Sequence, residues 1–122
     1  MSWKSEVEEL RQRQQMAEGM GGAEKVARQH ARGKLDARAR LAALVDPGSF
    51  REVGKIAGKG RYGPDGGLLD LAASNFLFGR ANIEGRPVVA SADDFTVRGG
   101  AADASIHRKF TQCEAMAHSL KI

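Results

Sequence analysis

The sequence has little of what secreted or membrane proteins need. It contains one cysteine, Cys113, which excludes an internal disulfide framework. No stretch approaches the roughly 20 apolar residues of a membrane-spanning helix, and no apolar run follows the N-terminus as a signal peptide requires. These absences predict a cytoplasmic protein with no membrane partner.

Aromatic residues are also scarce, with five Phe, one Trp and one Tyr among 122 residues. A chain of this length forms one domain at most, and few large side chains are available to fill its core. The helical pattern at the C-terminal end runs to the last residues, which is typical of a helix that packs on a further surface. We therefore expect the chain to be incomplete as a folding unit, or to depend on a partner.

Positive charge is concentrated in the first half of the chain. Residues 1–61 hold 13 Lys/Arg against 8 Asp/Glu, whereas residues 62–122 hold 6 against 7. A basic helical patch is compatible with nucleic-acid binding, but this half lacks the aromatics and the motifs of known nucleic-acid modules. A solvated face, or one that meets an acidic partner or a phosphorylated ligand, is the better expectation. The excess lies mainly on Lys25, Arg28, Arg32, Lys34, Arg38 and Arg40.

Residues 1–49 predict a basic helical segment. Ser5–Glu8 matches a capping box at the start of a first helix, which ends near residues 19–22. A second helix is expected from Ala23 to Arg32, closed by Gly33.

A third helix follows, capped by Asp36. The Asp-Pro-Gly-Ser sequence at 46–49 stops it with a turn. Its apolar face is predicted to consist of Leu41, Leu44 and Val45.

Residues 50–122 change from a helical to a sheet pattern. A short strand is expected at Phe50–Val53, and Gly58–Gly67 is predicted to be a glycine-rich loop. Phe76–Ile83 and Pro87–Ala92 predict two strands joined by a tight turn at 84–85. Because the second strand is apolar on both faces, both of its sides should be covered.

The chain then predicts a strand at Ser91–Val97, a turn at Gly99-Gly100 and a helix that begins at Ala101. Free N–H groups at such a helix N-terminus suit a phosphate or an oxyanion. On the pattern alone, a tight turn for packing the helix on the sheet is the preferred interpretation, and Asp103 adds a carboxylate near the same helix end. The apolar stripe of the helix is Ile106, Phe110, Cys113, Ala117 and Leu120.

The remaining candidate residues favour structural roles. Cys113 lies on the apolar stripe and is expected in the core rather than as a nucleophile. Asp93-Asp94 lies at a strand end, where two carboxylates are expected to cap the turn or to meet Arg98 or Arg108 rather than to form a cation site. The three histidines, of which His30 is expected at the surface or in a cap, do not have metal-ligand spacing, so no metal site is expected. They are His30, His107 and His118.

Two blocks of the sequence resemble one enzyme family. The stretch KVARQHARGKLDARARLAALVDPGSFREVG at 25–54 is similar to the opening of the carboxyltransferase (β) subunit of biotin-dependent acyl-CoA carboxylases of the propionyl-CoA and methylcrotonyl-CoA type. The stretch NFLFGRANIEGRPVVASADDFTVRGGAADASIHRK at 75–109 resembles the strand, hairpin, strand and Asp-Phe-Thr-Val-x-Gly-Gly run of the same family. Both blocks occur in the family's order.

The resemblance implies an α/β protein with part of a crotonase-like (ClpP/crotonase) fold, with 1–49 as a helical segment and 50–122 as the start of the carboxyltransferase domain. It also implies transfer of a carboxyl group from carboxybiotin to the α-carbon of an acyl-CoA, with fixed N–H donors stabilising the enolates. The implied partners are other carboxyltransferase subunits in a homo-oligomer and a biotin carboxylase or biotin carboxyl carrier subunit that carries the biotin. This chain alone is expected to be inactive; a nucleic-acid-binding module and a truncated interaction or scaffold protein are the alternatives.

The resemblance assigns no catalytic residue to this chain. It does imply that Gly99, Gly100 and Ala101 lie as backbone donors near the CoA cleft, although the family often has Ser where Ala101 stands. Lys25, Arg28 or Lys34 would then contact the CoA phosphates, and a structural or subunit-contact role for these three residues is the alternative. Two further departures, Asp36 for a usual Thr and Ala39 for a common acidic residue, lie in the third helix.

Overall fold

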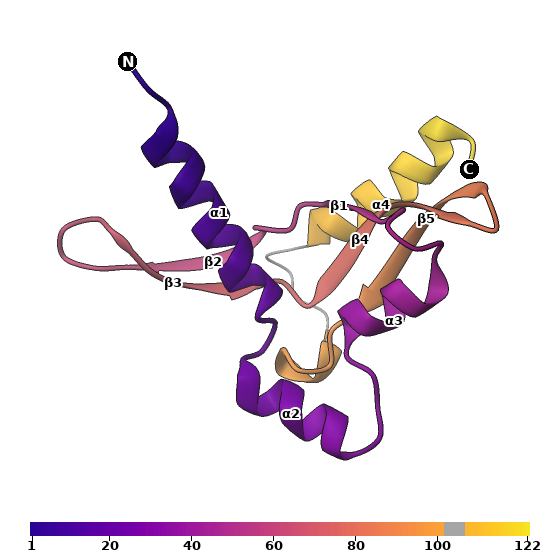
Figure 1. The fold of residues 1–122 in the computed structure, drawn as a ribbon, viewed down its shortest axis with the longest axis horizontal. Coiled ribbons are helices and arrows are strands. Elements are labelled where there is room, and N and C mark those ends of the chain that lie inside the picture. The colour runs from indigo at the N-terminus through magenta and orange to yellow at the C-terminus, as the bar shows by residue number, and fades with distance from the viewer. Residues whose placement is uncertain (102–106) are drawn as a thin grey trace.

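The computed structural model describes residues 1–101 and 107–122, which form helices on both faces of a small antiparallel sheet (Figure 1). The helices are α1 (Lys4–Glu18), α2 (Ala23–Ala31), α3 (Ala37–Leu44) and α4 (His107–Leu120), with a short 3₁₀ turn at Arg98–Gly100. The strands are β1 (Arg51–Val53), β2 (Gly58–Tyr62), β3 (Leu68–Ala73), β4 (Phe76–Ile83) and β5 (Arg86–Asp93). The expected α/β class and most of the element order are confirmed.

The main sheet has the strand order β1-β4-β5, and all neighbours are antiparallel. The expected β4–β5 hairpin turns at Glu84 and Gly85, whose φ angles of 50° and 79° are those of a two-residue turn that matches strand twist. The Asp46 carboxylate accepts hydrogen bonds from both of these amides, at 2.7 and 2.8 Å. The turn after α3 is thereby fastened to the far end of the hairpin.

Two apolar clusters lie on opposite faces of this sheet. Alternate residues of β4 point to opposite sides, so Leu77 faces α3 whereas Phe78 faces α4. The first cluster is Ala37, Leu41, Val45, Leu77, Ala81 and Ala90, and the second contains Phe76, Phe78, Phe110, Cys113 and Met116. The prediction that β5 needs cover on both sides is confirmed.

The predicted glycine-rich loop at Gly58–Gly67 is wrong. Residues 58–62 form β2, which pairs with β3 in a separate two-stranded sheet that projects beside α1 (Figure 1). Glycine lowers the strand signal in a sequence, but Gly58 is needed here because a side chain would overlap the carbonyl oxygen of Ala72 on the paired strand. The loop is therefore confined to residues 63–67.

Two smaller expectations about the helices are also corrected. Helix α1 begins at Lys4, so Ser5 lies inside the first turn, and its hydroxyl donates to the Glu6 carboxylate rather than capping a backbone N–H. Leu44 is exposed because α3 presents Leu41 and Val45 to the sheet instead. Leu120 is likewise exposed at the end of α4, so the predicted stripe packs on the core through Phe110 and Cys113, while Ile106 lies outside the described residues.

The caps around α2 and α3 agree with the sequence prediction. Gly33 follows α2 with φ 73°, and the Asp36 carboxylate accepts a hydrogen bond of 2.8 Å from the Ala39 amide at the start of α3. The other Asp36 oxygen lies 2.8 Å from Nε2 of His30, whose side chain is half exposed, as expected for a surface residue. Asp36 therefore joins the end of α2 to the start of α3.

This arrangement predicts a pH-dependent contribution of Asp36 to stability. Burial raises the pKa of Asp36, but the Ala39 amide and His30 together outweigh it, so the folded pKa lies below its usual value. A depressed folded pKa stabilises the fold above the unfolded value of about 3.9 and loses that effect as the pH falls further. Asp36→Ala should cost about 1 kcal/mol at neutral pH and less in acid, measured by urea unfolding. Asp36→Ser keeps a cap and is the control; equal losses at all pH values would contradict the prediction.

Candidate anion-binding site

The chain after β5 differs from the predicted strand, turn and helix. β5 ends at Asp93, so Phe95, Thr96 and Val97 lie in a turn rather than in a strand. The next three residues all have positive φ, at 51° for Arg98, 63° for Gly99 and 74° for Gly100. Ala101, where the helix was expected to begin, is extended and not helical, and Asp103 lies outside the described residues.

Buried polar side chains hold this turn in place. The Asn75 side chain, 1% exposed, donates to the carbonyl oxygens of Val97 at 3.3 Å and Ala101 at 2.6 Å. Asp94 is equally buried, and its Oδ1 accepts from both the backbone N–H and the hydroxyl of Thr96 at 2.9 and 2.6 Å. Asp94 therefore caps the turn, as expected, and the turn is built from inside the protein.

The same turn is fastened to the link between α1 and α2. The Gly21 N–H donates to the Thr96 hydroxyl at 3.0 Å. A side chain at Gly21 would overlap the backbone of Thr96, so only glycine permits this approach. Residues 75 positions apart thus meet, and α2 is set beside the turn.

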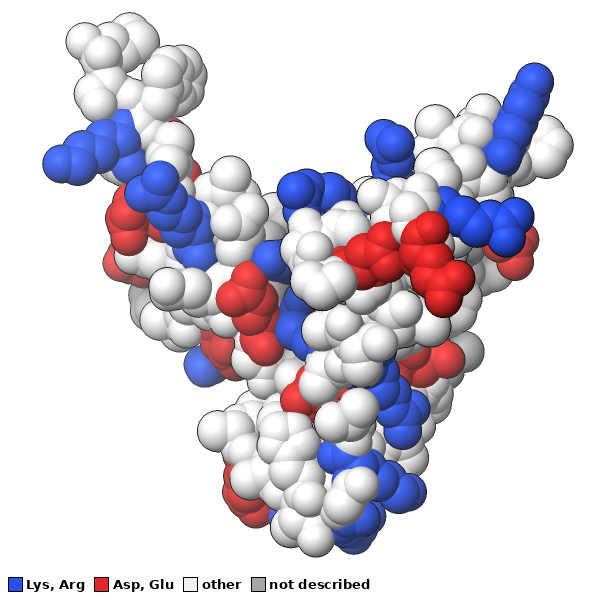
Figure 2. Space-filling model, turned by 45° about the vertical axis from the view of Figure 1, so that its right-hand side comes forward, with Lys and Arg blue, Asp and Glu red and all other residues white. Residues whose placement is uncertain are grey.

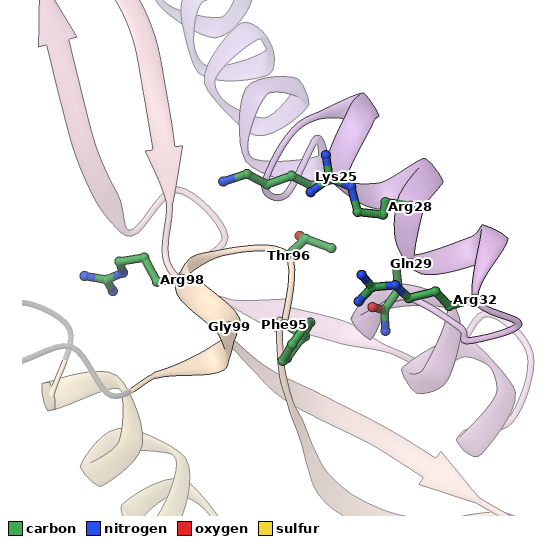
Figure 3. A pocket seen from close by; sticks show the side chains of 8 residues that line it. All are labelled: Lys25, Arg28, Gln29, Arg32, Phe95, Thr96, Arg98 and Gly99. Atoms are coloured by element: carbon green, nitrogen blue, oxygen red, sulfur yellow. The ribbon is translucent and has the colours of Figure 1, made fainter.

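A cavity of about 330 Å³ lies between α2 and the turn (Figure 3). In Figure 3, Gln29 and Arg32 point from α2 toward Phe95, and Arg98 extends from the other side of the turn. A second cavity of about 340 Å³ continues from it and shares Lys25, Thr96 and Arg98. The lining of the first cavity is Lys25, Arg28, Gln29, Arg32, Phe95, Thr96, Arg98 and Gly99.

The cavity is strongly cationic. Four of its eight lining residues are Lys or Arg, and Glu24, at 2.9 Å from Arg28, is an acidic partner outside the lining. Figure 2 shows basic side chains gathered on one side of the lower part of the molecule, where α2 lies. Guanidinium groups recognise phosphate and carboxylate oxygens through paired hydrogen bonds. Among the described residues, the lining contains no cysteine, histidine or carboxylate, so its chemistry suits anion binding rather than acid–base or nucleophilic catalysis.

The structure brings some of the predicted site residues together. Lys25, Arg28 and Gly99 line the cavity, whereas Lys34 does not. The amides of Gly100 and Ala101 donate within the turn, to the carbonyl oxygens of Val97 at 3.0 Å and Arg98 at 3.2 Å.

Arg32, Gln29, Thr96 and Arg98 are lining residues that were not predicted as ligand contacts. Arg32 could have been found, because positions 25, 28 and 32 recur at three and four residues and share one helix face. The other three depend on the tertiary contact with the turn.

Of the helices in residues 1–101 and 107–122, none combines the length and apolar character needed to cross a bilayer.

Comparisons with known proteins identify the family. The carboxyl transferase domain model matches residues 28–122. The 12S subunit of methylmalonyl-CoA carboxyltransferase from Propionibacterium freudenreichii is 44% identical over 99 residues, which are 79% of this chain and 18% of that protein. The carboxyltransferase subunit of propionyl-CoA carboxylase from Haloferax mediterranei is 29% identical over all of this chain and 23% of its own length. The chain thus spans about a fifth of these relatives.

Solved structures agree in fold. The transcarboxylase 12S crystal structure with methylmalonyl-CoA and methylmalonic acid bound has a TM-score of 0.79 and 37% identity over 96% of this chain and 23% of that one. The β subunit of geranyl-CoA carboxylase from P. aeruginosa has a TM-score of 0.75 and 27% identity over 95% of this chain and 21% of its own. The expected crotonase-like architecture is therefore confirmed for the part present, and the nucleic-acid alternative gains no support. The chain belongs to the carboxyl transferase domain family.

Proposed function

We propose that this chain contributes a phosphate-binding part of the CoA site to an acyl-CoA carboxyltransferase. The proposal rests on the cationic cavity between α2 and the turn at 94–101. All of its lining residues except Lys25 lie within the segment that the family model matches. CoA carries three phosphate groups on an elongated molecule, and the two adjoining cavities suit a ligand that extends beyond its phosphates. The related transcarboxylase 12S structure has methylmalonyl-CoA bound, which supports this choice of ligand.

The activity that we propose for the complete protein is inferred from the same relatives. The complete protein would transfer a carboxyl group from carboxybiotin, carried on a partner protein or domain, to the α-carbon of an acyl-CoA. It would act in the cytoplasm, in an oligomer with other carboxyltransferase subunits and with a biotin carboxylase or biotin carboxyl carrier subunit. The hexamer assembly of transcarboxylase 12S supports the oligomer. The 122 residues would bind CoA without catalysing the transfer.

The division between residues 49 and 50 would separate two sequence segments rather than two packing units, since α3 packs on β5 across it.

Replacing two arginines by alanine tests whether the cavity binds the phosphate groups of CoA. Arg28→Ala with Arg32→Ala should weaken CoA binding at least about tenfold, because a hydrogen bond to a charged group contributes about 1.5–3 kcal/mol and tenfold corresponds to about 1.4 kcal/mol. Titration calorimetry at low ionic strength measures the effect, with pantetheine as the ligand without phosphates. The matched control is Arg11→Ala on α1, whose nearest acidic partner is Glu8 at 3.9 Å.

The outcomes separate the alternatives. Equal affinities for CoA and pantetheine, or an equal loss in the Arg11 variant, would contradict a phosphate site at this cavity. Ala101→Pro tests the proposed backbone donors at Gly99, Gly100 and Ala101, because it removes the Ala101 N–H, which donates to the Arg98 carbonyl oxygen in this structure, while the φ of −64° at this position accepts proline. Unchanged CoA affinity in this variant would remove Ala101 from the site.

A further inference from the structure

A second charged site lies on the α4 side of the sheet, away from the cationic cavity. Lys109 in the first turn of α4 is only 8% exposed, and its ammonium donates to the Ser74 hydroxyl at 2.8 Å. Ser74 in turn donates to the carbonyl oxygen of Phe76 at 3.0 Å. An ammonium group has three N–H donors, so this hydroxyl uses one of them.

Among the described residues, the charges around Lys109 do not balance. Glu52 is the carboxylate whose field acts on Lys109, but its Oε2 is already paired with Arg38 at 2.9 Å. Within the described part of the chain, Lys109 has no ion-pair partner, so two cations face one carboxylate. Burial, followed by the opposing fields of Glu52 and Arg38, holds the pKa of Lys109 below its usual value. Burying a charge is unfavourable unless it is fully paired and hydrogen-bonded, so an additional anion would stabilise this cluster.

There is room for such an anion next to Lys109. A cavity of about 420 Å³ opens there, within the range of roughly 300–1,000 Å³ that is typical of small-molecule sites. Gly54 allows the lysine to lie along its wall, because a side chain at this position would come within 3.2 Å of the Lys109 Cε. The lining is Val53, Gly54, Ala57, Gly58, Phe78, Arg108, Lys109 and Gln112.

We propose that this cavity binds a small carboxylate that carries a short apolar chain. The Lys109 ammonium, with the Arg108 guanidinium and the Gln112 amide at the same cavity, supplies donors for the two carboxylate oxygens. Val53, Ala57 and Phe78 form an apolar wall against which a chain of a few carbons packs. This site shares no lining residue with the cavity proposed for CoA, so either proposal can fail without the other.

The probes that test this site are sodium propionate and its neutral, nearly isosteric analogue propionamide. Propionate should bind the 122-residue chain with an affinity at least tenfold above that of propionamide, measured by titration calorimetry at constant ionic strength. Lys109→Met removes the charge and keeps the apolar stem, so it should lower propionate affinity at least tenfold while leaving the chain folded. Lys55→Met is the matched control, because Lys55 pairs with Glu18 at 2.7 Å and does not line the cavity.

A further variant changes the charge balance in the opposite direction. Glu52→Gln removes the competing carboxylate and should tighten propionate binding by several-fold. Equal binding of propionate and propionamide to the wild-type chain would overturn the proposal, whatever the variants do. An equal loss of affinity in the Lys55 and Lys109 variants would overturn it as well.

Discussion

Gly21→Ala is expected to weaken CoA binding strongly and to destabilise the chain by about 3 kcal/mol, at the upper end of the usual cost of overpacking. The methyl group would overlap the Thr96 carbonyl and lie 2.6 Å from its carbon. Backbone cannot rotate away as a flexible side chain can, so the link between α1 and α2 must move. Because the cationic cavity lies between α2 and this turn, its lining residues would move apart.

The control for this variant is Gly19→Ala in the same link. Gly19 has φ −68°, which alanine adopts, and its nearest contact would be the Met16 carbonyl oxygen at 3.2 Å. Urea unfolding and CoA titration should therefore show a much smaller change. Thr96→Val tests the hydrogen bonds alone, since it keeps the shape but removes the hydroxyl that joins Gly21 to Asp94. A Gly21 variant with normal stability and normal CoA affinity would disprove the role given to this contact.

Phe78→Ala is expected to cost about 3–5 kcal/mol of unfolding free energy, the usual range for removing a buried phenylalanine. Phe78 is 1% exposed and packs with Phe76, whose ring stacks on Phe110 of α4 at 4.1 Å between centroids. The cost arises because the surrounding side chains relax only partly into the space left behind. Since whole domains are stable by only about 5–15 kcal/mol, this variant should lose a large part of the stability of the chain.

The matched control is Phe95→Ala, which removes the same side chain from the surface. Phe95 is 59% exposed, so its loss should change the unfolding free energy by less than about 0.5 kcal/mol. Circular dichroism against urea gives both values. If the two variants lose the same stability, the α4 side of the sheet is not the core that the packing indicates.

Local sequence signals determined much of the secondary structure. Asp36 accepts a backbone hydrogen bond as a helix cap, Gly33 has positive φ, and Glu84-Gly85 forms a tight hairpin turn. Each depends on the conformational preference of one or two residues, which does not require the rest of the fold. The resemblance of the blocks at 25–54 and 75–109 was likewise sufficient to indicate the family.

Where the sequence pattern was ambiguous, only the tertiary structure determined which conformation the chain adopts. Glycine by itself indicates a loop. In the structure, however, Gly58 lies in a strand, where the backbone of the paired strand approaches it closely. Residues 95–97 have a strand composition but form a turn, because Asn75 and Asp94 satisfy its backbone groups from the core. The cavity depends on the same contacts, since the Gly21–Thr96 hydrogen bond holds the turn beside α2. The sequence alone thus determined the local turns, caps and family, whereas contacts between distant residues decided the shape of the site, because composition does not encode which backbones approach each other.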